Sequence, residues 1–118
     1  NMYSSFFELL NYMNHIMKKN GATFLLFIHP NRYQVQYQDW KKICKRWNFI
    51  ESDFDLEKRN HRIEEYCSKN DILFIDPIDN FKIEQNQLYL KNDVHYNIKG
   101  HKLAAEIAAE KIYSIINE

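Results

Sequence analysis

Residues 89–105, with the sequence YLKNDVHYNIKGHKLAA, place an acid and an imidazole two positions apart, directly before an alanine-rich helical pattern. In an extended segment, residues i and i+2 point to the same side, so the side chains of Asp93 and His95 can face one pocket. A carboxylate beside a histidine fixes the imidazole tautomer and stabilises the imidazolium that forms when the ring takes a proton. The pair therefore predicts acid–base catalysis, with His95 transferring the proton and Asp93 orienting it.

Three further residues are candidates for substrate binding: Asn97, His29 and Arg32. Asn97 directly precedes the last helical pattern, where an N-cap is the alternative role. His29 and Arg32 follow an apolar run, and ligands of open α/β sheets bind beyond the carboxyl ends of the strands. A structural hydrogen bond is the alternative for His29, and a plain surface position for Arg32. His101 is expected to pack or hydrogen-bond at the junction between loop and helix.

The sequence predicts no metal site and no cofactor. His95 and His101 lie close to Asp93, but a His-x5-His spacing is not typical of zinc sites and no cysteine pair accompanies it. Glycine-rich phosphate loops are missing, which argues against nucleotide binding. Cys44 and Cys67 fall at apolar positions of predicted helices and are expected to be buried thiols.

Two apolar runs and several helical patterns must position these residues. The runs, at about residues 23–28 and 72–75, predict buried parallel strands ended by Pro30 and by Asp76-Pro77. The segment 78–92 reads as a polar loop. The remaining apolar residues recur at helical spacing in four groups: Phe6, Leu9, Leu10, Met13, Ile16 and Met17; Trp40, Ile43, Cys44 and Trp47; Leu56, Ile63, Tyr66 and Cys67; and Ala104, Ala108, Ile112 and Ile115.

The helix boundaries can also be predicted. Gly21 is the expected cap of the first helix. Ser52 or Asp53 is the expected cap of the third. The last helix is expected from about residue 98 to 116, with Ala104, Ala108, Ile112 and Ile115 facing inward. Helix, strand, helices, strand and helix make an α/β order.

Length and charge limit the function classes. The 118 residues are enough for one domain, and 16 basic residues balance 16 acidic ones. No global field therefore favours nucleic acid, and the apolar runs are too short to span a bilayer. A signal peptide would lie upstream of these residues, so the sequence gives no localisation.

The segment Asp93-x-His95-x-Asn97-x-x-Gly100-His101 resembles the C-terminal block of the SGNH/GDSL hydrolase family. In that family, a D-x-H or D-x-x-H loop before the last helix supplies the catalytic Asp and His. The D-x-H subset includes esterases and relatives of polysaccharide O-acetyltransferases. The order of strands and helices follows the family's C-terminal half over roughly residues 6–116. The resemblance thus implies a three-layer α/β/α, flavodoxin-like fold and an ester-bearing small molecule or an acylated glycan as substrate.

The chain departs from the family in its nucleophile. None of its five serines stands in a Gly-Asp-Ser setting after a strand, and its two glycines, Gly21 and Gly100, leave no glycine-bearing oxyanion block. Residues 1–118 are therefore expected to be the C-terminal part of a single SGNH hydrolase-like domain, inactive without its nucleophile-bearing N-terminal part. The alternative is a non-catalytic α/β binding or assembly module.

The strand count predicts a partner. Two parallel strands cannot cover the apolar faces of four helices, so the sheet is expected to be completed by the missing N-terminal part or by self-association.

Overall fold

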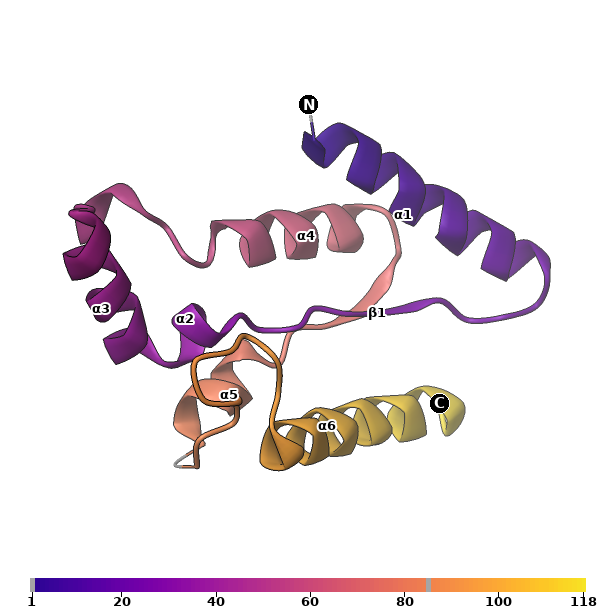
Figure 1. The fold of residues 1–118 in the computed structure, drawn as a ribbon. Helices are drawn as coiled ribbons and strands as arrows, with labels where there is room; N and C mark the ends of the chain where they lie inside the picture. The colour runs from indigo at the N-terminus through magenta and orange to yellow at the C-terminus, as the bar shows by residue number, and fades with distance from the viewer. Residues whose placement is uncertain (1, 85) are drawn as a thin grey trace.

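The computed structural model of the protein describes residues 2–84 and 86–118. Its centre is a two-stranded parallel sheet of β1 (Leu25–Phe27) and β2 (Leu73–Ile75), in which Leu26 pairs with Phe74. The parallel pairing predicted from the two apolar runs is confirmed. The protein is of mixed helix and strand, and Figure 1 shows helix α4 on one side of the sheet and α6 on the other.

Helix α1 (Met2–Lys19) leads into β1. Gly21 has a φ of 71°, and the N–H of Ala22 donates to the carbonyl of Met17 over 2.9 Å. A left-handed residue followed by such a bond is the usual end of a helix, and glycine adopts this conformation without strain. The predicted cap at Gly21 is confirmed.

Between the strands the chain forms α2 (Arg32–Val35), α3 (Tyr37–Trp47), the 3-10 turn η1 (Glu51–Asp53) and α4 (Lys58–Lys69). The predicted cap at Ser52 or Asp53 is wrong, because these residues belong to η1 and α4 begins five residues after Asp53. Leu56, assigned to the third helical pattern, therefore lies outside α4.

After β2 the chain forms α5 (Ile78–Ile83) and α6 (Ile98–Ile116). The prediction of a polar loop over 78–92 is wrong. The segment contains α5, and the side chains of Phe81, Leu88 and Tyr89 in it are buried. The predicted bounds of the last helix are confirmed.

The larger apolar core joins α1 and α4 to the sheet. Buried side chains of α1, α4 and the strand ends meet there: Leu10, Ile28, Ile63, Cys67 and Ile72. Cys44 and Cys67 are buried free thiols, as predicted. This core packs α1 and α4 against the sheet.

A second, smaller core seats α6. Phe81, Leu88 and Tyr89 are buried, and Leu103, Ala104 and Ile107 of α6 pack against them. The inward orientation predicted for Ile112 is wrong, because 45% of that residue is exposed. The apolar side chains of α6 that pack against this core thus come from residues 103–107, in the first half of the helix.

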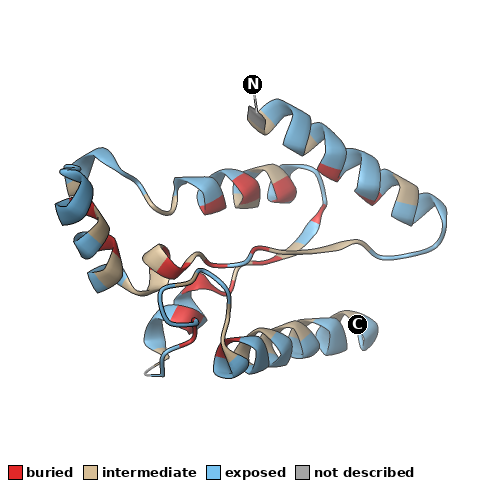
Figure 2. Cartoon of the chain, in the orientation of Figure 1, coloured by how far each residue is buried: buried red, intermediate tan, exposed pale blue. Residues whose placement is uncertain are grey.

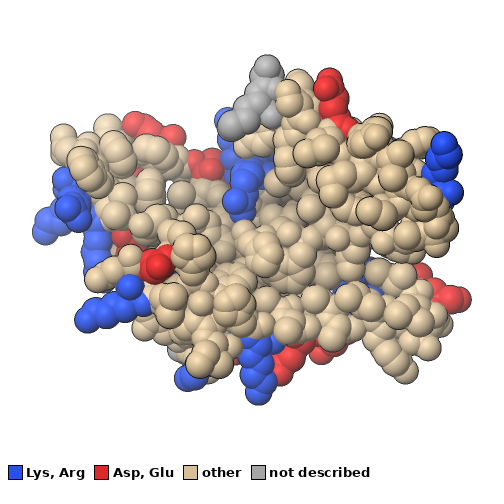
Figure 3. Space-filling model, turned by 45° about the vertical axis from the view of Figure 1, so that its right-hand side comes forward, with Lys and Arg blue, Asp and Glu red and all other residues tan. Residues whose placement is uncertain are grey.

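Much apolar surface stays uncovered. Large exposed apolar side chains lie along α1 and the end of α6 and include Phe6, Leu9, Met13, Met17, Tyr113 and Ile116. Both helices are mostly exposed in Figure 2, and Figure 3 shows a broad area without Lys, Arg, Asp or Glu across the middle of one face. The radius of gyration is 16.4 Å, whereas about 13.5 Å is typical of a compact chain of this length.

Candidate functional site

The predicted acid–histidine pair lies on a hairpin-like loop between α5 and α6. Tyr89 and Tyr96 form an antiparallel bridge across its base. Inside the bridge, the N–H of Leu90 donates to the carbonyl of His95 over 2.9 Å. Outside the bridge, the N–H of Asn97 donates to the carbonyl of Leu88 over 2.9 Å. The backbone thus closes the loop on both sides of the bridge.

A tight turn forms the tip of this loop. The N–H of Asp93 donates to the carbonyl of Leu90 over 3.2 Å, and Asn92 has a φ of 57°. Asparagine tolerates this left-handed conformation better than other residues with a Cβ atom. The turn fixes the direction in which the chain leaves residue 92 and enters the pair.

Asp93 and His95 are in direct contact. Oδ1 of Asp93 lies 2.6 Å from Nδ1 of His95 and also accepts the backbone N–H of His95 over 3.1 Å. The bonds from this N–H and from the imidazole lower the pKa of Asp93 from its ordinary value. Since 78% of the His95 side chain is exposed, the other edge of the ring is open to solvent.

Asn97 is the N-cap of α6. Its side-chain oxygen accepts the N–H of Gly100 over 3.0 Å, and its amide donates to the carbonyl of Gln87 over 2.6 Å. The capping role weighed from the sequence is confirmed. Contact between Asn97 and a substrate stays a prediction.

Gly100 allows α6 to approach the loop closely. A Cβ atom at this position would lie 2.2 Å from the carbonyl oxygen of Leu88 and 3.0 Å from Cβ of Tyr96. Both distances are shorter than ordinary van der Waals contact, so the helix can begin at this distance from the loop only with glycine here. The residue therefore helps to place the loop that carries the pair.

His29 follows β1 and is exposed. Its Nδ1 lies 3.1 Å from the hydroxyl of Tyr96, and partial burial, followed by the charges of His101 and Arg59, lowers its pKa. The structural hydrogen bond weighed from the sequence is thus present, and a contact with substrate stays a prediction. His101 packs at the junction as expected, with its ring edge-on to Tyr96 at 5.5 Å between centroids.

The sequence analysis did not single out Tyr96, which lies between the rings of His29 and His101. Burial raises the pKa of its phenol, so the hydroxyl stays protonated across the ordinary pH range. The alternation of side chains could have identified Tyr96. In an extended segment, the residue directly after His95 points to the side opposite that of the His95 ring. Tyr96 packs inward where His95 faces outward.

Arg32 lies inward, with 8% of the residue exposed. Its guanidinium donates to the carboxylate of Asp39 and to the backbone carbonyls of Leu90 and Asp93. These bonds join α2 and α3 to the turn that carries the pair. A contact between Arg32 and a substrate is not tested by this arrangement and stays a prediction.

A buried polar network lies beyond the carboxyl end of β2. Asn60, 1% exposed, donates to the carboxylate of Asp76 over 2.6 Å and accepts from the amide of Gln34 over 3.1 Å. The other oxygen of Asp76 accepts the N–H of Ile78 over 3.0 Å. Each of these groups has a partner, so the network connects α2, α4 and α5 and is structural.

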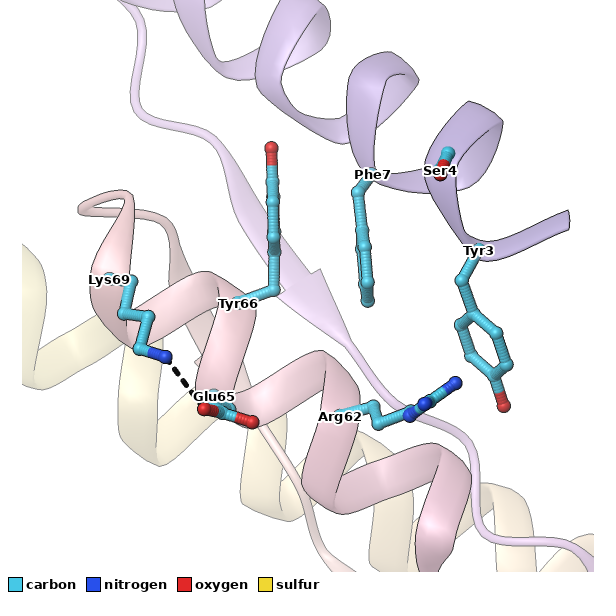
Figure 4. Close-up of a pocket in the computed structure, with 7 residues that line it drawn as sticks. All are labelled: Tyr3, Ser4, Phe7, Arg62, Glu65, Tyr66 and Lys69. Atoms are coloured by element: carbon cyan, nitrogen blue, oxygen red, sulfur yellow. Dashed lines mark hydrogen bonds and ion pairs between the residues drawn. The ribbon is translucent and has the colours of Figure 1, made fainter. Parts of the chain in front are cut away.

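A pocket of about 330 Å³ between α1 and α4 is a second hollow to consider. Figure 4 shows the rings of Phe7 and Tyr66 face to face, with centroids 4.2 Å apart, and Lys69 paired with Glu65. These contacts are the packing between the two helices. The pocket holds no acid–histidine pair and is not the candidate site.

Over residues 2–84 and 86–118, no group of three or more His, Cys, Asp or Glu side chains could hold a metal ion. Within the same ranges, no helix combines the length and the apolar character that crossing a bilayer requires.

Comparison with protein-family models, with curated proteins and with solved structures finds no match to this chain.

Proposed function

We propose that the chain supplies the histidine–aspartate half of an SGNH-type serine esterase or O-acyltransferase, as the C-terminal part of a three-layer α/β/α, flavodoxin-like domain. The main support is the 2.6 Å contact between Oδ1 of Asp93 and Nδ1 of His95. The carboxylate can only accept, so Nδ1 carries the proton and Nε2 is left with a free lone pair. This is the state that a general base requires.

The proposed chemistry is acyl transfer in two steps. Nε2 of His95 takes the proton of a serine hydroxyl while the serine oxygen bonds to the acyl carbonyl carbon of the ester. The imidazolium, stabilised by Asp93, then gives that proton to the departing alcohol, and an acyl-serine remains. Water or an acceptor hydroxyl releases the acyl group by the same route. No cofactor is needed.

The nucleophile is assigned to a polypeptide segment other than residues 1–118. The serines of this chain lie on α1, in η1, on α4 and on α6, and the hydrogen bonds of the His95 ring lead to Asp93. The uncovered apolar side chains of α1 and α6 offer a surface on which the N-terminal part of the same domain would pack. The expected substrate is an ester-bearing small molecule or an acylated glycan.

A non-catalytic α/β binding or assembly module is the second candidate. It is favoured by the same uncovered apolar side chains and by the exposure of the His95 side chain, which is 78%. In this case the Asp93–His95 contact would only stabilise the turn. The two proposals differ in whether a serine becomes reactive.

The test uses the protein encoded by the complete reading frame. A fluorophosphonate probe should label a serine, because the base raises its nucleophilicity. His95→Ala should abolish the labelling and lower the turnover of an aryl acetate by about 10³-fold, within the range of general acid–base catalysis. Asp93→Asn should lower turnover somewhat less.

His61→Ala is the matched control, because His61 is an exposed histidine of α4 that pairs with Glu57. This variant should keep full labelling and turnover. An unlabelled native protein, or normal turnover with His95 replaced, would reject the hydrolase proposal and leave the module.

A further inference from the structure

The guanidinium of Arg32 connects two distant parts of the chain. Its Nη1 donates to the carbonyl of Leu90 over 3.1 Å and to that of Asp93 over 3.0 Å. These carbonyls belong to the first and last residues of the turn at the tip of the loop. One nitrogen therefore holds both ends of the turn.

Asp39 fixes the other side of the guanidinium. Its Oδ2 accepts Nε of Arg32 over 2.9 Å and Nη2 over 2.6 Å, while its Oδ1 accepts from Lys42 over 2.9 Å. A buried guanidinium is costly to desolvate unless a carboxylate and good hydrogen bonds compensate it. Asp39 and the two carbonyls supply both, so the orientation of the Arg32 head group is strongly determined.

The position of the turn decides where the acid of the pair points. Holding the carbonyl of Asp93 fixes the peptide plane between residues 93 and 94. It therefore restricts the backbone that carries the Asp93 carboxylate towards His95. Without this bond, the turn is supported by its own 3.2 Å hydrogen bond and by the left-handed Asn92.

We propose that Arg32, oriented by Asp39, is a positioning residue that holds the turn over residues 90–93 so that the Asp93 carboxylate meets Nδ1 of His95. The chemical meaning of this role rests on the function proposed above, whereas the mechanical role does not. Arg32 acts through the backbone of the loop, and its planar fork suits this task in a way that the single ammonium of lysine does not.

The test is ¹⁵N NMR of histidine-labelled chain 1–118, which reports which nitrogen of His95 carries the proton. The native chain should show the Nδ1–H form predominantly. Arg32→Gln and Asp39→Asn should each lower the ratio of the Nδ1–H form to the Nε2–H form about fivefold, as expected for weakening one charge-assisted hydrogen bond. Arg32→Lys should give an intermediate ratio.

Arg59→Gln is the matched control. Arg59 also donates to a backbone carbonyl, that of His29 over 3.0 Å, and its other hydrogen bonds go to Asn60 of its own helix. This variant should leave the tautomer ratio of His95 unchanged. If Arg32 had a purely structural role, its variants would have a lower unfolding midpoint. The tautomer ratio of His95 in the folded chain would then be the same as in the native protein.

An unchanged ratio in a folded Arg32→Gln chain would overturn the proposal. If that variant does not fold, Arg32→Lys and Asp39→Asn decide, and native ratios in both would overturn it equally. Failure of the proposed function can be distinguished from failure of the proposal for Arg32. In that case His95→Ala would keep full turnover in the protein from the complete reading frame, while the Arg32 variants would still shift the tautomer ratio.

Discussion

At the scale of single residues, one oxygen atom organises the candidate site. Oδ1 of Asp93 accepts both the backbone N–H and the ring nitrogen of His95. The first bond locks the carboxylate to the local backbone, and the second uses that fixed carboxylate to orient the imidazole. Both bonds favour the charged carboxylate over its protonated form.

This arrangement predicts how the pair responds to acid. The pKa of Asp93 lies below its ordinary value of 3.8 because of the bonds from His95. A carboxyl whose pKa is lowered by folding contributes stability above its unfolded pKa, and that contribution is lost as the pH falls through the folded pKa. The contact should therefore be intact at pH 5 and should be lost only as the pH falls below the ordinary value of 3.8.

¹³C NMR of the side-chain carboxyl of Asp93 measures this titration directly, with Asp93→Asn identifying the signal. A midpoint at or above the ordinary value would contradict the prediction.

At the scale of elements, the site depends on how α6 is seated. The helix begins at the cap Asn97, and one turn later Gly100 brings it against the carbonyl of Leu88. The proposed catalytic pair lies on the loop before the helix, and the first turn of the helix sets where that loop ends.

Gly100→Ala separates helix propensity from packing. Alanine is favoured over glycine in a helix by about 1 kcal/mol, but the added Cβ would lie 2.2 Å from a backbone oxygen. We expect packing to dominate, with a net loss of about 1–3 kcal/mol in the free energy of unfolding, as for other overpacked sites. Urea denaturation measures it.

Ser114→Ala, at an exposed position of the same helix, should change stability by less than about 0.5 kcal/mol. A more stable Gly100→Ala protein would show that α6 can move away from Leu88 without cost.

Long patterns made the main elements predictable, while short ones did not. The bounds of α6, its cap and the two parallel strands follow from residue patterns alone. By contrast, α2 and α5 have four and six residues, which is too short for a helical period to be visible. Phe81 and Tyr89 are buried by contacts with α6 and its loop, which no local pattern records.

The same limit applies to the candidate site. Asp93 and His95 are two residues apart, so their contact could be predicted from spacing. Arg32 lies 61 residues from Asp93, and only the packing of α2 against the loop brings them together. A sequence pattern could mark Arg32 as a residue near the site, but it could not show that the guanidinium points inward.

At the scale of the whole molecule, the solvent-accessible surface is larger than expected for a folded monomer of this mass. The accessible area is 8637 Å², whereas about 6,800 Å² is typical of a folded monomer of this mass. The difference is comparable to the area that one partner buries in a large protein–protein interface. Together with the exposed apolar side chains of α1, it supports the proposal that another polypeptide packs on this surface.

The isolated chain should therefore associate with itself. Leu9 lies in the exposed stripe of α1 with 55% of its surface accessible. Leu9→Lys should weaken association about tenfold, because it replaces an apolar side chain by a charge in the contact. Sedimentation equilibrium over a range of concentrations measures the constant.

Ile83→Lys, at an exposed apolar position of α5, is the matched control and should leave association unchanged. A native chain that stays monomeric at millimolar concentration would refute the prediction.

The hairpin-like loop has a consequence for the order of folding. Its bond between Leu90 and His95 closes over six residues, whereas the bond from Ile28 to Ile75 joins positions 47 residues apart. Short loops close faster and at lower entropic cost than long ones. In pulsed hydrogen exchange during refolding, the amide of Leu90 should gain protection before that of Ile28, so the acid and the histidine would meet before the sheet that supports them exists.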